Sequence, residues 1–164
     1  MKSLVTYKLG KHTYSVYRCT FDDIPIHLKY VKPYWESTNT YIPQQIARME
    51  AAVSEGCAYY MLIDNDSLGA FFYYEKVQGL CVVIAIWAHS YRELYLGVGY
   101  MKYYKSLNVV RYIPHSSDNI PYQKMVTSVQ QYVNGTRICS ANLNLPKHTR
   151  QLKRIYNKAE IIEG

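Results

Sequence analysis

The chain has 164 residues, a length that suits one domain with one hydrophobic core. Apolar residues make up 49% of the chain and charged residues 19%, so the composition excludes a disordered chain and a fibrous one. The formal net charge of +7 suits an anionic partner, whether nucleic acid, an acidic surface or a phosphorylated cofactor, and it excludes none of these classes.

The first part of the chain has the pattern of one strand followed by two helices. Residues 12–19 alternate between apolar and polar positions, which predicts a strand. Helical spacing of apolar residues then predicts helices at 24–35 and 44–56, with a loop at 36–43 between them. Gly56 is a natural residue at which the second helix can end.

Three strands are predicted after this pair of helices. Residues 57–64 and 68–77 flank a turn at 65–67, and this arrangement is typical of a β-hairpin. The apolar, β-branched run at 80–88 follows after a short turn, so we expect it to be the next antiparallel strand.

The remaining segments predict two helices on either side of a short extended piece, and then a strand, a helix and a strand. They are a helix at 90–108 capped by Ser90, an extended piece at 109–113, a helix at 116–135, a strand at 136–145, a helix at 146–157 and a strand at 159–163. This order predicts an α+β domain over residues 1–164, with a mixed, mainly antiparallel central sheet and helices on both faces.

Cysteine and tyrosine usage adds two expectations. The four cysteines (Cys19, Cys57, Cys81 and Cys139) show neither CxxC nor Cys/His ligand spacing, and we find no secretory signal and no apolar run of about 18 residues. We therefore expect reduced thiols, no metal site, no membrane association and a cytoplasmic location. The 19 tyrosines combine an apolar ring with a polar tip, and we interpret them as extensive contact surface.

Three local patterns, taken with this order of elements, resemble one family. They are YSVYRCTFDDIPIHL at 14–28, EGCAYYMLIDNDSLGAFFYY at 55–74, and Ile155-Tyr156-Asn157-Lys158, which is similar to a Leu-Tyr-Glu-Lys motif. All three resemble parts of the GNAT family of acetyl-CoA-dependent N-acyltransferases. The family usually passes directly from the helix at 90–108 to its next strand, so residues at about 109–135 look like an insert.

The resemblance implies transfer of an acetyl group from acetyl-CoA to an amine, on either a small molecule or a protein. It implies that Tyr156 protonates the CoA thiolate as this group leaves. A phenol with a pKa near 10 keeps its proton at neutral pH and can therefore donate it. The alternative is that Tyr156 is a packing residue.

The resemblance also implies a pyrophosphate cradle at the start of the helix at 90–108. In one register Arg92 takes the first position of the family pattern and Gly97 the last, but Tyr95 stands where a glycine belongs. Shifting by two residues places Gly97 and Gly99 in the pattern and Leu94 where an Arg or Gln belongs. The helix can instead be an ordinary amphipathic one that tolerates two glycines.

A second threading and the missing base leave further questions open. Residues 109–120 can supply the strand and loop instead, with 118–133 as the helix and no glycine cradle. The strand at 80–88 carries no carboxylate, so the candidate bases are Glu75 and His89. The resemblance implies that backbone groups of this strand, at Ile84, Ile86 and Trp87, position the cofactor.

Two alternatives to acyl transfer remain. The chain can be a catalytically inactive GNAT-like module for binding or assembly, as a homo-oligomer or with virion proteins. Short divergent proteins of this kind resemble internal virion or accessory proteins of tailed phages, which would place the chain in the host cytoplasm or the virion interior. The basic cluster at 147–154 gives weak support to nucleic-acid binding, because on a helix its charges are expected to point several ways.

Overall fold

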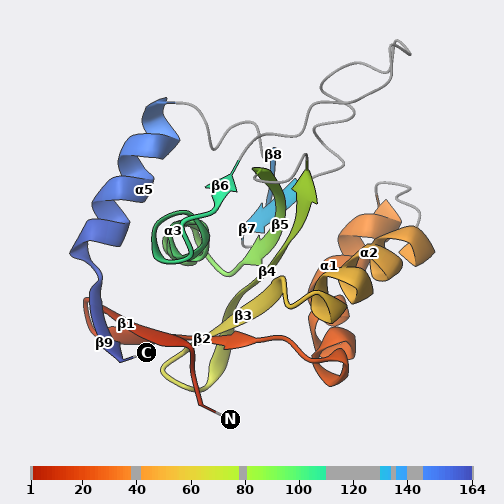
Figure 1. Cartoon of the computed structure of the whole chain (residues 1–164), viewed down its shortest axis with the longest axis horizontal. Helices are drawn as coiled ribbons and strands as arrows, with labels where there is room; N and C mark the ends of the chain where they lie inside the picture. The colour runs from red at the N-terminus through yellow and green to blue at the C-terminus, as the bar shows by residue number, and fades with distance from the viewer. Residues whose placement is uncertain are drawn as a thin grey trace.

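The computed structural model describes residues 2–37, 42–77, 81–109, 130–133, 136–139 and 146–163. In these residues the chain forms an α+β fold around one central sheet of nine strands, with helices on both faces (Figure 1).

The strands follow one another in the sheet in the order β8-β7-β5-β4-β3-β2-β1-β9, with β6 also beside β5. They are β1 (Val5–Leu9), β2 (His12–Arg18), β3 (Ala58–Ile63), β4 (Ser67–Val77), β5 (Cys81–Ala88), β6 (Asn108–Val109), β7 (Gln130–Val133), β8 (Thr136–Cys139) and β9 (Glu160–Glu163). In the part of the sheet ordered β5-β4-β3-β2-β1-β9, every pair of neighbouring strands is antiparallel. Strands β6 and β7 instead pair with β5 in parallel. The sheet is therefore mixed and mainly antiparallel.

The helices divide between the two faces, as Figure 1 shows. They are α1 (Ile24–Ser37) and α2 (Ile42–Ser54) on one side, and α3 (Tyr91–Gly99) and α5 (Pro146–Lys158) on the other, with a 3-10 turn at Phe21–Asp23 and a π-helical turn at Tyr100–Tyr104. Successive residues of β4 point to opposite helices. Phe71 stacks on His27 of α1 at 4.7 Å between ring centroids, and Phe72 lies 6.0 Å from Tyr100. Both faces of the sheet are therefore packed.

Tyrosines make up much of this core. Tyr7, Tyr14, Tyr59 and Tyr100 have at most 1% of their surface exposed. The Tyr59 hydroxyl donates a hydrogen bond to the Gly56 carbonyl at 3.1 Å, so this phenol has a polar partner inside the protein. The sequence-based interpretation of tyrosine as contact surface missed this structural role.

Most of the predicted elements are confirmed. The strand at 12–19, the hairpin around 65–67 and the antiparallel strand at 80–88 correspond to β2, the β3–β4 turn and β5. Asp64 and Asn65 both have positive φ, at 52° and 59°, in keeping with a tight hairpin turn. The helices around the predicted loop at 36–43 differ from expectation at their ends: α1 is longer and continues to Ser37, while α2 is shifted by two residues and runs from Ile42 to Ser54.

Two predictions about strands were wrong. Residues 130–133 were assigned to a helix in both threadings, yet they form β7, parallel to β5 and antiparallel to β8. Pairing on both sides of β7 outweighs its local pattern. Residues 5–9 were not predicted to form a strand, but β1 pairs with β2 and β9. The rest of the predicted insert, residues 110–129 and 134–135, lies outside the described residues, as does the end of the predicted strand at 140–145.

Other expectations concern thiols and membranes. Cys19 and Cys57 are free thiols, while the side chains of Cys81 and Cys139 are outside the described part. None of the helices among the described residues is both long and apolar enough to cross a membrane.

His27 is a buried histidine of α1. It is 3% exposed, and its Nε2 lies 3.2 Å from the Cys19 sulfur. Burial lowers the pKa of His27 to about 4, with the charge of Asp23 opposing this shift, and burial raises the pKa of Cys19. Both groups are therefore neutral at pH 7, which makes this contact a structural hydrogen bond and not a thiolate–imidazolium pair.

This burial predicts a stability that falls in mild acid. Because the unfolded chain binds a proton at His27 near pH 6.5 and the folded chain near pH 4, the free energy of unfolding decreases as the pH falls between these values. We expect a loss of about 2 kcal/mol at pH 5 relative to pH 7.5, measured by urea unfolding. His27→Phe keeps the stacking on Phe71 and should remove this loss, whereas His12→Gln at an exposed site should leave it unchanged. An equal loss in His27→Phe would contradict the assignment.

Candidate functional site

A cleft of about 450 Å³ lies where β5 gives way to α3. Its walls come from three segments that are far apart in the sequence: the start of β2, the β3–β4 turn and the first turn of α3. Its polar lining includes His12, Asp64, His89, Ser90, Arg92 and Glu93. We take this cleft as the candidate site because polar and titratable side chains from three elements converge there.

The backbone at the end of β5 sets up the start of α3. The His89 amide donates to the Gly69 carbonyl at 2.7 Å, and Ser90 then adopts an extended conformation (φ −149°, ψ 175°) as the N-cap. The amides of the first helical turn, at 91–93, have no carbonyl four residues earlier in the helix to bond to. The helix therefore presents these amides and the positive end of its dipole at the cleft.

A glycine allows β4 to approach this turn closely. A Cβ at Gly69 would lie 2.9 Å from Cγ1 of Ile63 and 3.2 Å from Cγ of Glu93. Any larger residue at 69 would push the first turn of α3 away from the sheet, and with it the wall of the cleft.

Charged groups of both signs lie around the start of α3. Glu93 is only 4% exposed, and its carboxylate accepts a hydrogen bond from the Ser90 hydroxyl. Arg92 is exposed and reaches the β1–β2 turn, where a Cβ on Gly10 would lie 4.0 Å from its Nη1. Burial raises the pKa of Tyr14, and the interaction with Arg92 opposes that rise. The cleft therefore combines an accessible guanidinium with the buried carboxylate of Glu93 and the exposed carboxylates of Asp64 and Asp66.

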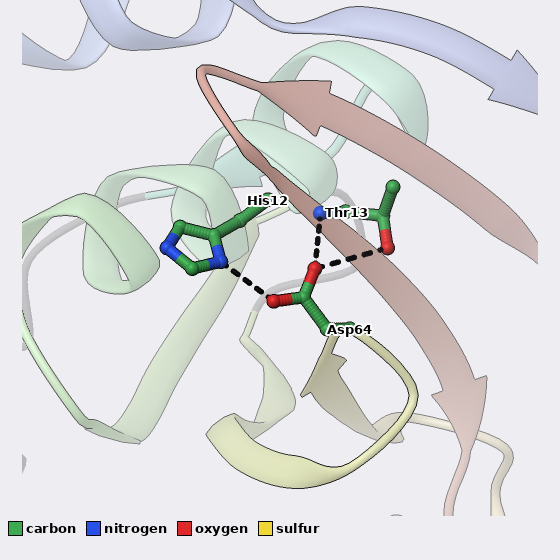
Figure 2. A network of polar contacts seen from close by, with 3 residues as sticks. All are labelled: His12, Thr13 and Asp64. Carbon is green, nitrogen blue, oxygen red and sulfur yellow. Dashed lines mark hydrogen bonds and ion pairs between the residues drawn. The ribbon is translucent and has the colours of Figure 1, made fainter.

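His12 and Asp64 form a hydrogen-bonded pair at the mouth of the cleft (Figure 2). The distance from Nδ1 of His12 to Oδ2 of Asp64 is 2.6 Å, and the Thr13 amide donates to Oδ1 of Asp64 at 2.9 Å. These contacts, the Thr13 amide first, lower the pKa of Asp64. The carboxylate holds His12 by Nδ1, so Nε2 is the ring nitrogen left for another partner.

Sequence reasoning missed this pair. The residues are 52 positions apart, and no spacing motif connects them. The pairing of β2 with β3, in which Tyr14 lies opposite Ile63, brings them together. The turn signal at 65–67 was the one sequence feature that marked this part of the cleft.

The two predicted bases are not close to one another. His89 lines the cleft. Glu75 lies six residues along β4 from Gly69, about 20 Å away in an extended strand. There it pairs with Arg48 of α2, with distances of 2.5 and 3.0 Å from Nε and Nη2 to its two oxygens. Glu75 therefore belongs to a separate charged cluster.

Tyr156 lies on α5 and packs against the other end of α3. Its hydroxyl is 2.9 Å from that of Tyr7, and its ring lies 5.1 Å from the ring of Tyr103. Burial raises the pKa of Tyr156, but the hydrogen bond with Tyr7 works in the opposite direction. Burial raises the pKa of Tyr7 as well, and there the same hydrogen bond adds to the rise. Either hydroxyl can donate in this contact, and burial keeps the proton on both phenols at neutral pH.

The two predicted cradle glycines lie at the C-terminal end of α3. Past the first turn, amides of an α-helix bond to the carbonyls four residues earlier, so Gly97 and Gly99 are far from the free amides at 91–93. A Cβ at Gly99 would lie 2.5 Å from Cδ2 of Tyr156. Gly99 thus lets α5 approach α3, while Tyr95 is a buried residue within the same helix. Of the predicted cradle residues, Arg92 is the one beside the cleft.

The predicted strand positions Ile84, Ile86 and Trp87 lie on β5. On one edge they pair with Tyr74, Phe72 and Phe71 of β4. On the other edge β6 pairs with Cys81 and Val82, and β7 with residues 86–88. In the part of the chain that the structure describes, the edge at 83–85 therefore has no strand partner. The backbone groups of residues 83–85 therefore lie between the segment of β5 that pairs with β6 and the segment that pairs with β7.

Searches for similar proteins gave no further constraint. No family model, no curated protein and no solved structure matches the chain. Among the described residues, no group of three or more His, Cys, Asp or Glu side chains is placed to hold a metal ion.

The contact between Gly99 and Tyr156 leads to a prediction about stability. Gly99→Ala should lower the free energy of unfolding by about 1–3 kcal/mol through overpacking, despite the better helix propensity of alanine. Urea unfolding measures this change. In a Tyr156→Ala background the same substitution should be neutral or stabilising, because the ring it meets is gone. A loss of the same size in both backgrounds would show that Tyr156 is not the cause.

Proposed function

We propose that the protein is a GNAT-like acyltransferase that transfers an acetyl group from acetyl-CoA to an amine on a small molecule or protein. The observation that carries this proposal is the second edge of β5. This edge has parallel partners at both ends and an unpaired stretch at 83–85 between them, within the described residues. The same strand leads directly into the first turn of α3.

This arrangement supports an extended acyl carrier with an anionic end. The amides at 91–93 and the guanidinium of Arg92 would hold phosphate, since both present N–H donors at the positive end of α3. The backbone around Ile84, which has no strand partner on this edge among the described residues, offers hydrogen bonds of the kind that an adjacent strand would otherwise make. Glu93 opposes an anion less than an exposed carboxylate would, because it is buried and bonded to Ser90.

When bound, acetyl-CoA supplies the acetyl group as a thioester. The chain must then accept a proton from the amine and provide one for the thiolate. His89 and His12 line the cleft at the end of the site proposed to hold phosphate, so a proton from the amine would reach them through water. Tyr156 retains its proton at neutral pH, as an acid for the leaving group requires, and its hydroxyl shares a hydrogen bond with that of Tyr7.

Acetyl-CoA binding is the first test, by titration calorimetry. We expect binding by the natural protein and a roughly tenfold or larger weakening in Arg92→Ala, through loss of a charge-assisted contact. Arg154→Ala removes the same charge from the exposed face of α5 and should bind as the natural protein does. Equal weakening in both variants, or no binding at all, would count against the proposal.

A second test separates chemistry from binding. Tyr156→Phe should lower kcat about 100-fold with an unchanged dissociation constant for acetyl-CoA, because it removes the proton donor and keeps the ring. Acetylation of a panel of amines, followed by release of free thiol, measures the rate. Tyr7→Phe removes only the supporting phenol and should have a smaller effect. An unchanged kcat in Tyr156→Phe would remove this residue from the mechanism.

A non-catalytic assembly module is the second candidate, and β9 favours it. This strand is last in the sheet order and carries Ile161 and Ile162, which are 53% and 49% exposed. An apolar edge strand is a surface on which another chain can add a strand. Self-association in sedimentation velocity, together with no heat from acetyl-CoA, would favour this function over acyl transfer.

A further inference from the structure

Helix α5 has one face in the core and one face in solvent. Leu152 is only 4% exposed, and Ile155 and Tyr156 pack against the same core. The solvent-facing side chains, which we call the basic face of α5, are Arg150, Lys153, Arg154, Asn157 and Lys158. The sequence of α5, PKHTRQLKRIYNK, contains no Asp or Glu.

The cations of the basic face lie along a single stripe. Arg150, Arg154 and Lys158 follow at intervals of four residues, and Lys153 lies three residues after Arg150. Residues at these intervals lie on the same side of a helix, so the stripe rises about 12 Å from Arg150 to Lys158. Of the cations in the predicted cluster at 147–154, the described side chains are those of Arg150, Lys153 and Arg154, and all three are exposed.

These charges have no carboxylate partner in the described part of the chain. The ion pairs found there join His12 to Asp64 and Arg48 to Glu75. The guanidinium of Arg154 donates to the side-chain oxygen of Gln151 on the same helix, at 3.1 and 2.6 Å. This contact leaves its charge uncompensated. Four like charges within about two turns repel one another, and an anionic partner would relieve that repulsion.

We propose that the basic face of α5 binds the phosphate backbone of nucleic acid. The stripe is a rigid row of cations, and phosphates form a regular row of anions, to which arginine can bond in a bidentate manner. Helices that lie on membranes bury an apolar face in the lipid. In α5 the apolar face is already used by the core, so the complementary partner is a charged polymer. This inference does not depend on acyl transfer.

Binding to a 20-base-pair DNA duplex at several salt concentrations tests the proposal, by fluorescence anisotropy. About four phosphate contacts predict a slope near −3.6 for the logarithm of the association constant against that of the salt concentration. The variant Arg150→Gln/Lys153→Gln/Lys158→Gln should reduce the slope to about −1 and weaken binding at least tenfold at low salt. The control Lys8→Gln/Lys11→Gln/Lys76→Gln loses the same charge from exposed sites on other elements and should retain the slope.

Several results would overturn nucleic-acid binding by the basic face of α5. Equal losses in the two triple variants would mean that overall charge and not α5 drives binding, and would overturn the proposal. So would absence of DNA binding at 50 mM salt, or binding to vesicles with 30% phosphatidylserine but not to DNA. Circular dichroism checks that the variants are folded. If the α5 triple variant is not folded, the single variants Lys153→Gln and Lys158→Gln should each reduce the slope by about 0.9.

Discussion

Aromatic packing on both faces of the hairpin β3–β4 is the interaction on which the rest of the structure depends. On one face Tyr59 lies 5.3 Å from Tyr100, and on the other Tyr60 lies 5.5 Å from His27, measured between ring centroids. Because successive residues of a strand point to opposite sides, one hairpin anchors the helices of both layers. These large rings exclude water, and they keep His27 neutral at physiological pH.

The two ends of α3 have different surroundings, polar at its first turn and tightly packed at its last turn. The first turn of α3 faces a cleft with free amides, Arg92 and a buried Glu93, while its last turn is pressed against Tyr156 at Gly99. A helix of nine residues therefore serves two purposes, one at each end. Of the two glycines in the predicted anion cradle, Gly99 lies in close contact with Tyr156, and the free amides of α3 belong to its first turn.

The proposed functions use different surfaces of the molecule. Acyl transfer would occupy the edge of β5 and the start of α3, assembly would use the edge strand β9, and nucleic acid would lie along the solvent face of α5. Acyl transfer and nucleic-acid binding are physically compatible because their surfaces differ, whereas the non-catalytic assembly module is an alternative to acyl transfer. Substitutions on one of these surfaces should therefore leave the other surfaces unchanged.

The sequence by itself determined the elements with strong local signals. The alternation of β2, the turn between β3 and β4, the apolar run of β5 and the periodicity of α1, α2, α3 and α5 all follow from nearest-neighbour chemistry along the chain. Tertiary structure alone decided that residues 130–133 extend the sheet, because β7 depends on partners about 45 residues earlier in β5 and a few residues later in β8. It also decided the site. His12 meets Asp64 through strand pairing, and Gly99 meets Tyr156 through helix packing, and contacts over such separations leave no spacing that a sequence pattern can record.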